Sequence, residues 1–166
     1  EFLSVGSAVV AGALWPGFGH AQAWPAKPIK VIVGFTPGGA VDLVARTLGQ
    51  AMTGGLGQPL VVENKPGAGT NIAMKALIEA PADGYTLMLT ANSIAANPAL
   101  YKPAPFDPEK DVAPVALVGR VPVVLAANAA SPFANVGQVI QTAKGKPNSV
   151  AYGSPGNGST PHMALE

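Results

Sequence analysis

The chain has 166 residues, 48% of them hydrophobic, and it contains 20 glycines and 17 prolines. This composition allows one globular unit or slightly more, built from many short elements joined by tight turns. Ten Lys and Arg residues against nine Asp and Glu leave a net charge of +1 with no basic run, which argues against nucleic acid as a partner.

The N-terminal stretch has the pattern of an export signal. Residues 2–14 are uncharged and too short to span a bilayer, and Ala21 and Ala23 supply the small residues that a signal peptidase needs before Trp24. We therefore predict a signal peptide over residues 1–23 and a periplasmic mature chain. The alternative, a buried N-terminal helix, is disfavoured by several glycines and a proline in this stretch. The absence of cysteine fits an envelope protein that is held together by packing.

The mature chain begins with a strand and helix pair. Residues 29–35 are rich in Ile and Val, which predicts a strand covered on both faces. From Val41 to Met52 apolar residues recur on one helical face, and Gly54-Gly55 is expected to end the helix.

Two more strands follow with the same spacing. Residues 59–63 and 85–90 predict strands, and residues 71–80 between them predict a helix with Thr70 as its N-cap. The resulting βαβαβ order predicts an α/β fold with a parallel sheet, whose turns meet at the carboxyl edge.

The remaining residues indicate a passage into a second lobe. After a proline-rich stretch, the apolar run at residues 112–127 predicts two strand segments joined at a kink. We then expect a helix at 136–144, a strand at 149–153 and a further helix that opens after residues 154–160.

Because the chain ends inside that last helix, we expect an N-terminal fragment with a truncated second lobe. The expected lobe 1 covers residues 24–120, and residues 121–166 form the hinge and the start of lobe 2.

Small and polar residues gather in the turns at 36–42, 66–71, 90–93 and 153–162. The N–H groups at a helix start favour an anion, and each exposed helix dipole adds about 0.3–1 kcal/mol. These turns hold no Lys or Arg apart from Lys65 just outside the second, so capture would depend on amides, hydroxyls and water. The alternative is that their glycines serve only tight turns. Asp42 would repel an anion, and we expect it to accept N–H groups of its own loop.

Catalytic and cofactor motifs are weak. Ser154 and Ser159 raise the alternative of an exported serine hydrolase or transferase, yet Tyr152 and Asn157 replace the first glycine of a G-x-S-x-G motif. His162, the only histidine of the mature chain, either donates to a ligand or packs at the surface, and it lacks companions for a zinc site. No nucleotide motif is complete. We therefore expect no enzyme activity, no cofactor and no metal.

Six spaced motifs resemble those of the Bug, or TctC-like, receptors of tripartite tricarboxylate transport systems. In chain order they start at Trp24-Pro25, Phe35-Thr36, Val62-Glu63, Ala82-Asp83, Asn97-Pro98 and Tyr152-Gly153. The resemblance implies a two-lobed periplasmic-binding-protein fold of the type II class. It also implies a monomeric receptor that closes on a small organic acid and delivers it to membrane transporter subunits. A carboxylate sensor that contacts a membrane kinase is the alternative.

The resemblance further implies which residues bind the acid. In that family the turn after the first strand and the Gly-Ser-rich turn of the other lobe hold the carboxylate, with bridging waters. The expected ligand-binding residues here are Thr36, Pro37, Gly38, Gly39, Asp42, Gly69, Thr70, Ala91, Asn92, Ser154, Gly156, Gly158, Ser159, Thr160 and His162. Di- or tricarboxylates, amino acids and aromatic acids all stay open as ligands.

Overall fold

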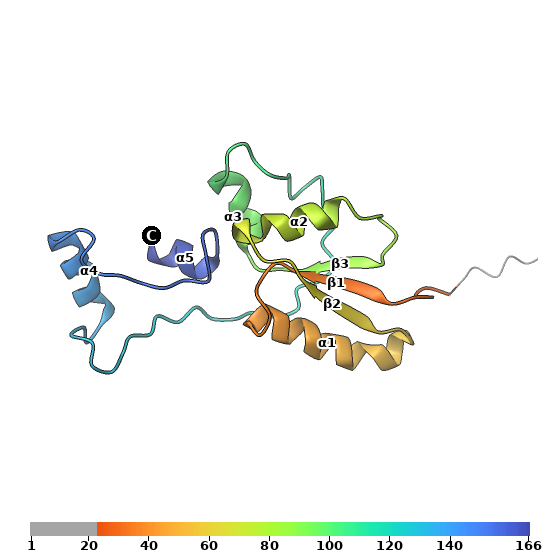
Figure 1. Ribbon diagram of the computed structural model, residues 1–166, viewed down its shortest axis with the longest axis horizontal. Coiled ribbons are helices and arrows are strands. Elements are labelled where there is room, and N and C mark those ends of the chain that lie inside the picture. Colours follow the sequence, from red (N-terminus) through yellow and green to blue (C-terminus); the bar gives the residue numbers. More distant parts are fainter. Residues whose placement is uncertain (1–22) are drawn as a thin grey trace, which may run out of the picture.

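The computed structural model describes residues 23–166, so the predicted signal peptide lies outside the described residues apart from Ala23. Three parallel strands form the sheet, in the order β2-β1-β3 (Figure 1). They are β1 (Ile29–Val33), β2 (Leu60–Asn64) and β3 (Thr86–Leu89). In the central strand, Val31 is paired with Val62 on one side and Leu87 on the other. The predicted parallel sheet is confirmed.

Helices cover both faces of this sheet. After β1 comes α1 (Ala40–Leu56), and after β2 come the short helix η1 (Ala68–Thr70) and α2 (Asn71–Ile78). Figure 1 shows α1 and α2 on opposite sides of the strands. The βαβαβ order is therefore confirmed, with strand boundaries within two residues of those expected.

The core lies on either side of β1, which explains why this strand is so apolar. Val31 and Val33 pack with Ala45 of α1, and Leu60 and Leu89 are among the partly buried side chains around them. On the other face Ile32 is buried, and so are Ala73 and Met74 of α2, a helix that contacts both β1 and β3.

The end of α1 differs from the expected one. The helix continues through Gly54 and Gly55 to Leu56, and Gly57 forms the C-cap. Gly57 has φ +67°, and its N–H donates to the Thr53 carbonyl at 2.9 Å. A left-handed C-cap favours glycine, which has no Cβ to clash, so the third glycine of this stretch ends the helix.

One helix was not predicted. The structure contains α3 (Ser93–Leu100), which includes Pro98. The sequence indicated only a proline-rich stretch from Pro98 onward, and proline inside a helix removes one hydrogen bond because it lacks an N–H. Its side chains Ser93 and Asn97 are buried, and the Asn97 amide donates to the Gly69 carbonyl and to Asn71 Oδ1, which ties the helix to the second turn and α2.

The predicted strands at 112–127 and 149–153 are absent from the described structure, so these two expectations were wrong. The chain runs extended from the sheet to α4 (Val136–Gly145) and returns to α5 (Thr160–Leu165), as Figure 1 shows. A strand needs a neighbour for its N–H and C=O groups, and no described strand pairs with either segment. Val115 and Val124 are accordingly 83% and 77% exposed.

The two predicted C-terminal helices do form, and each is capped. The Asn135 side chain accepts the Gln138 N–H at the start of α4, and Ser159 accepts the His162 N–H at the start of α5. Between residues 23 and 166, no helix combines the length and the apolar character needed to cross a membrane.

Candidate functional site

The four turns predicted to bind an anion all lead into helices. The turns after β1, β2 and β3 lie at the carboxyl edge of the parallel sheet and precede α1, η1 with α2, and α3. The fourth turn precedes α5. Ligands of parallel α/β sheets bind beyond the carboxyl ends of the strands, so this edge is the candidate site.

The first turn leaves N–H groups free at the start of α1. Gly39 is the N-cap, and its helix receives no side-chain cap. Among the described residues, no acceptor is found for the N–H groups of Ala40 and Val41. A Cβ at Gly38 would meet nothing within 4 Å, and one at Gly39 would meet only the Thr36 carbonyl, at 3.5 Å. The space in front of this helix start is open to an anion.

Asp42 ties this turn to the end of β2. Its Oδ2 accepts the Gly38 N–H at 2.9 Å and Arg46 Nε–H at 3.0 Å, and its Oδ1 accepts the Asn64 amide at 2.9 Å. The same amide of Asn64 also donates to the Phe35 carbonyl at 3.0 Å. The prediction that Asp42 bonds its own loop is confirmed.

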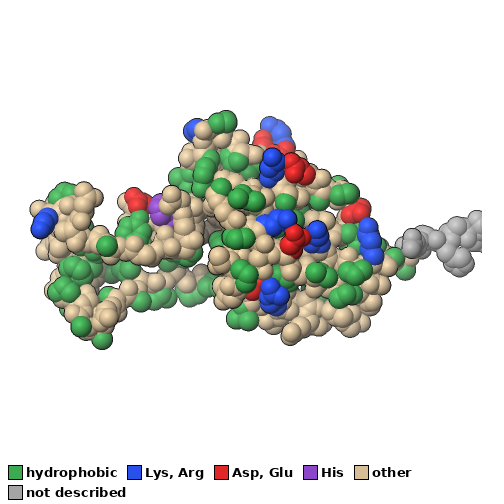
Figure 2. Space-filling model, in the orientation of Figure 1, with side chains coloured by type: hydrophobic (Ala, Val, Ile, Leu, Met, Phe, Trp, Pro, Cys, Tyr) green, Lys and Arg blue, Asp and Glu red, His purple; other side chains and the backbone are tan. Residues whose placement is uncertain are grey.

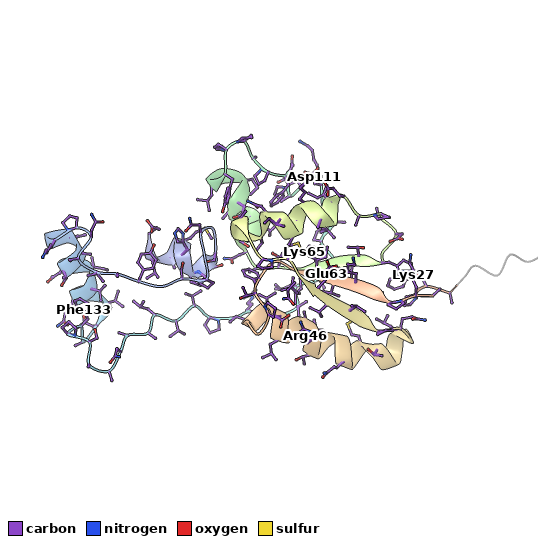
Figure 3. All side chains as sticks on the ribbon, in the orientation of Figure 1. Lys27, Arg46, Glu63, Lys65, Asp111 and Phe133 are labelled. Atoms are coloured by element: carbon purple, nitrogen blue, oxygen red, sulfur yellow. The ribbon has the colours of Figure 1, made fainter. Side chains whose placement is uncertain are left out.

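The charge of Asp42 is compensated by these partners. Asp42 is only 2% exposed, and the hydrogen bond from Arg46, ahead of those from Gly38 and Asn64, holds the pKa of Asp42 well below its usual range. Figure 3 labels Arg46 on α1, and its Nη2 also donates to Asn64 at 3.1 Å. A carboxylate neutralised in this way repels a nearby anion less than a free one.

A pH titration of stability tests the role of Asp42. Because its pKa is lowered by folding, the ionised group stabilises the protein above its unfolded pKa of about 3.9, and this contribution is lost as the pH falls below that value. We expect Asp42→Asn to be clearly less stable than the unmodified protein at pH 7, with the difference shrinking from about pH 4 downward. Urea unfolding between pH 7 and pH 3 measures this. A difference that is constant with pH would contradict it.

The second turn is conformationally strained. Four successive residues have positive φ: Gly67 (+130°), Ala68 (+47°), Gly69 (+60°) and Thr70 (+80°). Positive φ is unfavourable for residues with a Cβ and is unusual for a β-branched one. Thr70 is buried against Gly34, where an added Cβ would lie 2.7 Å from the Thr70 Cβ. Such strain persists only where the surroundings enforce it, and it is concentrated at functional sites.

Thr70 occupies the predicted N-cap position of α2 without capping the helix through its side chain. Its Oγ1 lies 3.5 Å from the Oγ of buried Ser93 instead. Because Ser93 begins α3, this contact links the second turn to the third.

Replacing Ala68 by glycine is expected to stabilise the protein by about 0.5–1 kcal/mol. Relief of the left-handed conformation gains about 1–2 kcal/mol, and the larger entropy of unfolded glycine removes about 0.5–1 kcal/mol of it. Ala68 is exposed, so no packing is lost. Urea denaturation measures the change, with Ala51→Gly in exposed α1 as the control that should destabilise. A destabilised Ala68→Gly variant would contradict the strain.

The third and fourth turns contact one another. Thr160 Oγ1 donates to Asn92 Oδ1 across 68 residues of sequence. The Tyr101 hydroxyl lies 3.5 Å from the Asn157 carbonyl. A groove of about 250 Å³ lies at this contact and is lined by Leu100, Tyr101, Asn157, Gly158 and His162.

The two candidate nucleophiles make structural hydrogen bonds. Ser154 Oγ accepts the Gly156 N–H at 3.4 Å, and Ser159 Oγ accepts the backbone N–H of His162 at 3.4 Å. The His162 ring instead lies 3.8 Å from the Glu166 carboxylate. Within residues 23–166, neither serine hydroxyl is hydrogen-bonded to a basic side chain, as a hydrolase would require. No three acidic, histidine or cysteine side chains in that range gather as metal ligands.

The predicted site residues thus fall into two groups. Residues of the second, third and fourth turns touch one another, through the contacts of Gly69, Thr70, Asn92 and Thr160. Residues 36–42 share the sheet edge with the second and third turns, but among the described residues no hydrogen bond or ion pair joins 36–42 to 154–162. Ala91 contributes only its carbonyl, which accepts the Ile94 N–H.

Sequence reasoning assigned no role to Arg46, Asn64 or Asn97. Arg46 follows Asp42 by four residues on the same helix, and this spacing is a recognised signal for an ion pair. The two asparagines have partners that are distant in sequence, so no local pattern indicates them.

The family assignment follows from comparison with known proteins. A family model described as "Tripartite tricarboxylate transporter family receptor" matches residues 44–166. The chain belongs to this family. The predicted resemblance to Bug and TctC-like receptors is therefore confirmed.

Individual relatives resemble this chain in sequence and in structure. A UPF0065 protein of Bordetella pertussis is 40% identical over 148 residues, which are 89% of this chain and 46% of the relative. The structure of R. palustris Rpa4515 with adipate has a TM-score of 0.77 and 34% identity, and covers 86% of this chain and 48% of that one. Periplasmic binding protein BugD has a TM-score of 0.50 and 39% identity, over 51% of this chain and 28% of that one.

The chain spans about half the length of the curated relatives that it matches. The alignment with Rpa4515 nevertheless extends beyond the sheet and its helices, because it covers 86% of the chain. The α/β fold of periplasmic solute-binding proteins is thereby confirmed for this receptor.

Proposed function

We propose that this receptor binds a small organic carboxylate at the carboxyl edge of its sheet, in a cleft between two lobes. The observation that carries the proposal is the first turn, where the N–H groups of Ala40 and Val41 have no acceptor among the described residues and face open space. Asp42 behind them has its charge compensated by Arg46. Such a helix start favours a carboxylate.

A linear dicarboxylate is a suitable first ligand to test, because a related structure contains one and the four turns offer donors for an acid. The related structure is that of R. palustris Rpa4515 with adipate, a dicarboxylate. The four turns contain backbone amides and hydroxyls, which accept many acids, and no fixed cation that would demand a particular one. Reversible capture through amides and water follows from that composition.

We propose further that one lobe covers residues 24–120 and that the other begins at residue 121. Ligand binding would close the two lobes, with the extended segments of Figure 1 acting as the hinge. Binding would shift the population from open to closed. The closed form would then be the one that membrane transporter subunits recognise, as the receptor family's description implies. The pattern of residues 1–23 supports export to the periplasm, where such a receptor would act as a monomer.

A thermal-shift screen of the full-length receptor tests this function. The panel contains dicarboxylates from succinate to adipate, citrate, acidic amino acids and benzoate, and adipamide serves as the uncharged control for adipate. We expect at least one carboxylate to raise the melting temperature in a saturable manner, because a ligand that binds only the folded state stabilises it. Adipamide should have no effect. No stabilisation by any member of the panel would contradict the proposal.

A further inference from the structure

The contact between the fourth turn and α3 contains an unsatisfied polar group. Asn97 is fully buried, at 0% exposure. Its Nδ2 donates to the Gly69 carbonyl and to Asn71 Oδ1 at 2.9 Å, whereas its Oδ1 has no hydrogen-bond partner. A buried acceptor without a donor costs free energy, so such an atom calls for a physical explanation.

That oxygen is directed at Gly158 of the fourth turn. A Cβ at Gly158 would lie 2.9 Å from Asn97 Oδ1, and one at Gly69 would lie 2.8 Å from the Asn157 carbonyl. Both glycines have positive φ, +78° and +60° respectively. Glycine is needed at the two positions because the segments approach more closely than a side chain allows.

Gly158 offers the missing donor. The residue is buried, and among the described residues its N–H donates to no acceptor. Gly158 thus has an N–H without an acceptor close to an oxygen without a donor, and a hydrogen bond between the two would satisfy both groups.

We propose that Asn97 is a positioning residue that fastens the turn at residues 156–160 to the sheet, its side-chain oxygen accepting the Gly158 N–H as the lobes close. Asn97 touches no ligand in this role. Through Nδ2 it also holds Gly69 in the strained second turn, so the same side chain fixes both turns. The closing step rests on the proposed function, whereas the contact between Asn97 and Gly158 does not.

Engineered disulfide formation measures this contact, because residues 1–166 contain no cysteine and any cysteine in the rest of the full-length receptor can be replaced by serine. Asn92→Cys with Thr160→Cys places a pair where the two side chains now touch. In the full-length receptor, the rate of crosslinking under a mild oxidant reports how often the fourth turn is seated. We expect Asn97→Ala to lower this rate about threefold to tenfold, as loss of one hydrogen bond would. Gln50→Ala, an amide deletion on the exposed face of α1, should not change it.

A double-mutant cycle separates positioning from general destabilisation. Gly158→Ala should also lower the rate, because its Cβ meets Asn97 Oδ1. Gly156→Ala serves as its control, because Gly156 also has positive φ but has open space around it. In the presence of Asn97→Ala, the same Gly158 substitution should have a smaller effect. The proposal would be overturned if Gly158→Ala lowered the rate by the same factor with and without Asn97→Ala, or if Asn97→Ala left the rate unchanged. Should circular dichroism show that Asn97→Ala does not fold, the crosslinking rates of Gly158→Ala and Gly156→Ala are compared: a lower rate in Gly158→Ala supports the proposal, and equal rates overturn it.

The ligand dependence of the same assay tests the proposed function separately. A carboxylate that closes the cleft should accelerate crosslinking in the receptor that carries only the two cysteine substitutions, and Asn97→Ala should reduce that acceleration. Because Asn92 and Thr160 are themselves predicted ligand-binding residues, binding is also measured by thermal shift in the receptor without the two cysteines. If no carboxylate stabilises that receptor or accelerates crosslinking, while Asn97→Ala still lowers the ligand-free rate, the positioning role stands and the binding function fails.

Discussion

Gly39→Val is expected to weaken carboxylate binding by roughly 10-fold to 100-fold while leaving the receptor folded. The valine side chain would occupy the open space in front of the N–H groups of Ala40 and Val41, and hydrogen bonds to a charged group contribute about 1.5–3 kcal/mol. Gly39 has φ −76° and ψ 170°, which valine adopts readily, and its Cβ would meet only the Thr36 carbonyl. Isothermal titration of the best carboxylate from the screen measures the loss.

The control for this substitution is Gly54→Val, at another glycine with open space around it on the same helix. This variant should bind with unchanged affinity. Melting temperatures of the two variants show whether either substitution unfolds the protein. A folded Gly39→Val receptor with full affinity would remove the first turn from the binding site.

Met74→Ala is expected to destabilise the protein by about 2–5 kcal/mol, the usual range for a large side chain deleted from a core. Met74 is 1% exposed on α2, the helix that covers the sheet opposite α1. Met74→Leu conserves the volume and should cost less than about 1.5 kcal/mol. Urea unfolding followed by circular dichroism gives both values. Equal effects of the two substitutions would show that Met74 does not fill the core as described.

The sheet and its first two helices were predictable because each has a local signal. The apolar run of β1 and the helical periodicity of α1 are visible within a few residues of sequence, and turn glycines separate the elements. The prediction of strands at 112–127 and 149–153 was wrong because a strand has no sufficient local signal. Strand formation depends on a neighbouring strand, and apolar composition alone does not supply one.

The site was predictable as a set of turns but not as a set of contacts. Glycine positions indicated the sharp turns at Gly38 and Gly69, both of which have positive φ. The left-handed Thr70 and the buried Asn97 were invisible, because packing against Gly34 and contact with Gly158 arise only in the folded chain.

Charge is distributed unequally over this receptor. Figure 2 shows most acidic and basic side chains over the sheet and its helices, whereas the part that contains α4 and α5 shows mainly apolar and uncharged groups. On the sheet, Glu63 lies between Lys30 and Lys65, at 3.0 and 2.7 Å, and Figure 3 labels two of the three. These cations are already paired with Glu63, which leaves amides as the donors best placed for an acid at the carboxyl edge.

The most direct test of carboxylate binding is a crystal structure of the full-length receptor with the acid that gives the largest thermal shift. We expect one carboxylate oxygen within about 2.7–3.2 Å of the N–H groups of Ala40 and Val41, with Asp42 still bonded to Arg46. A carboxylate bound away from the start of α1, or a first turn occupied by solvent alone in a ligand-bound receptor, would contradict the account.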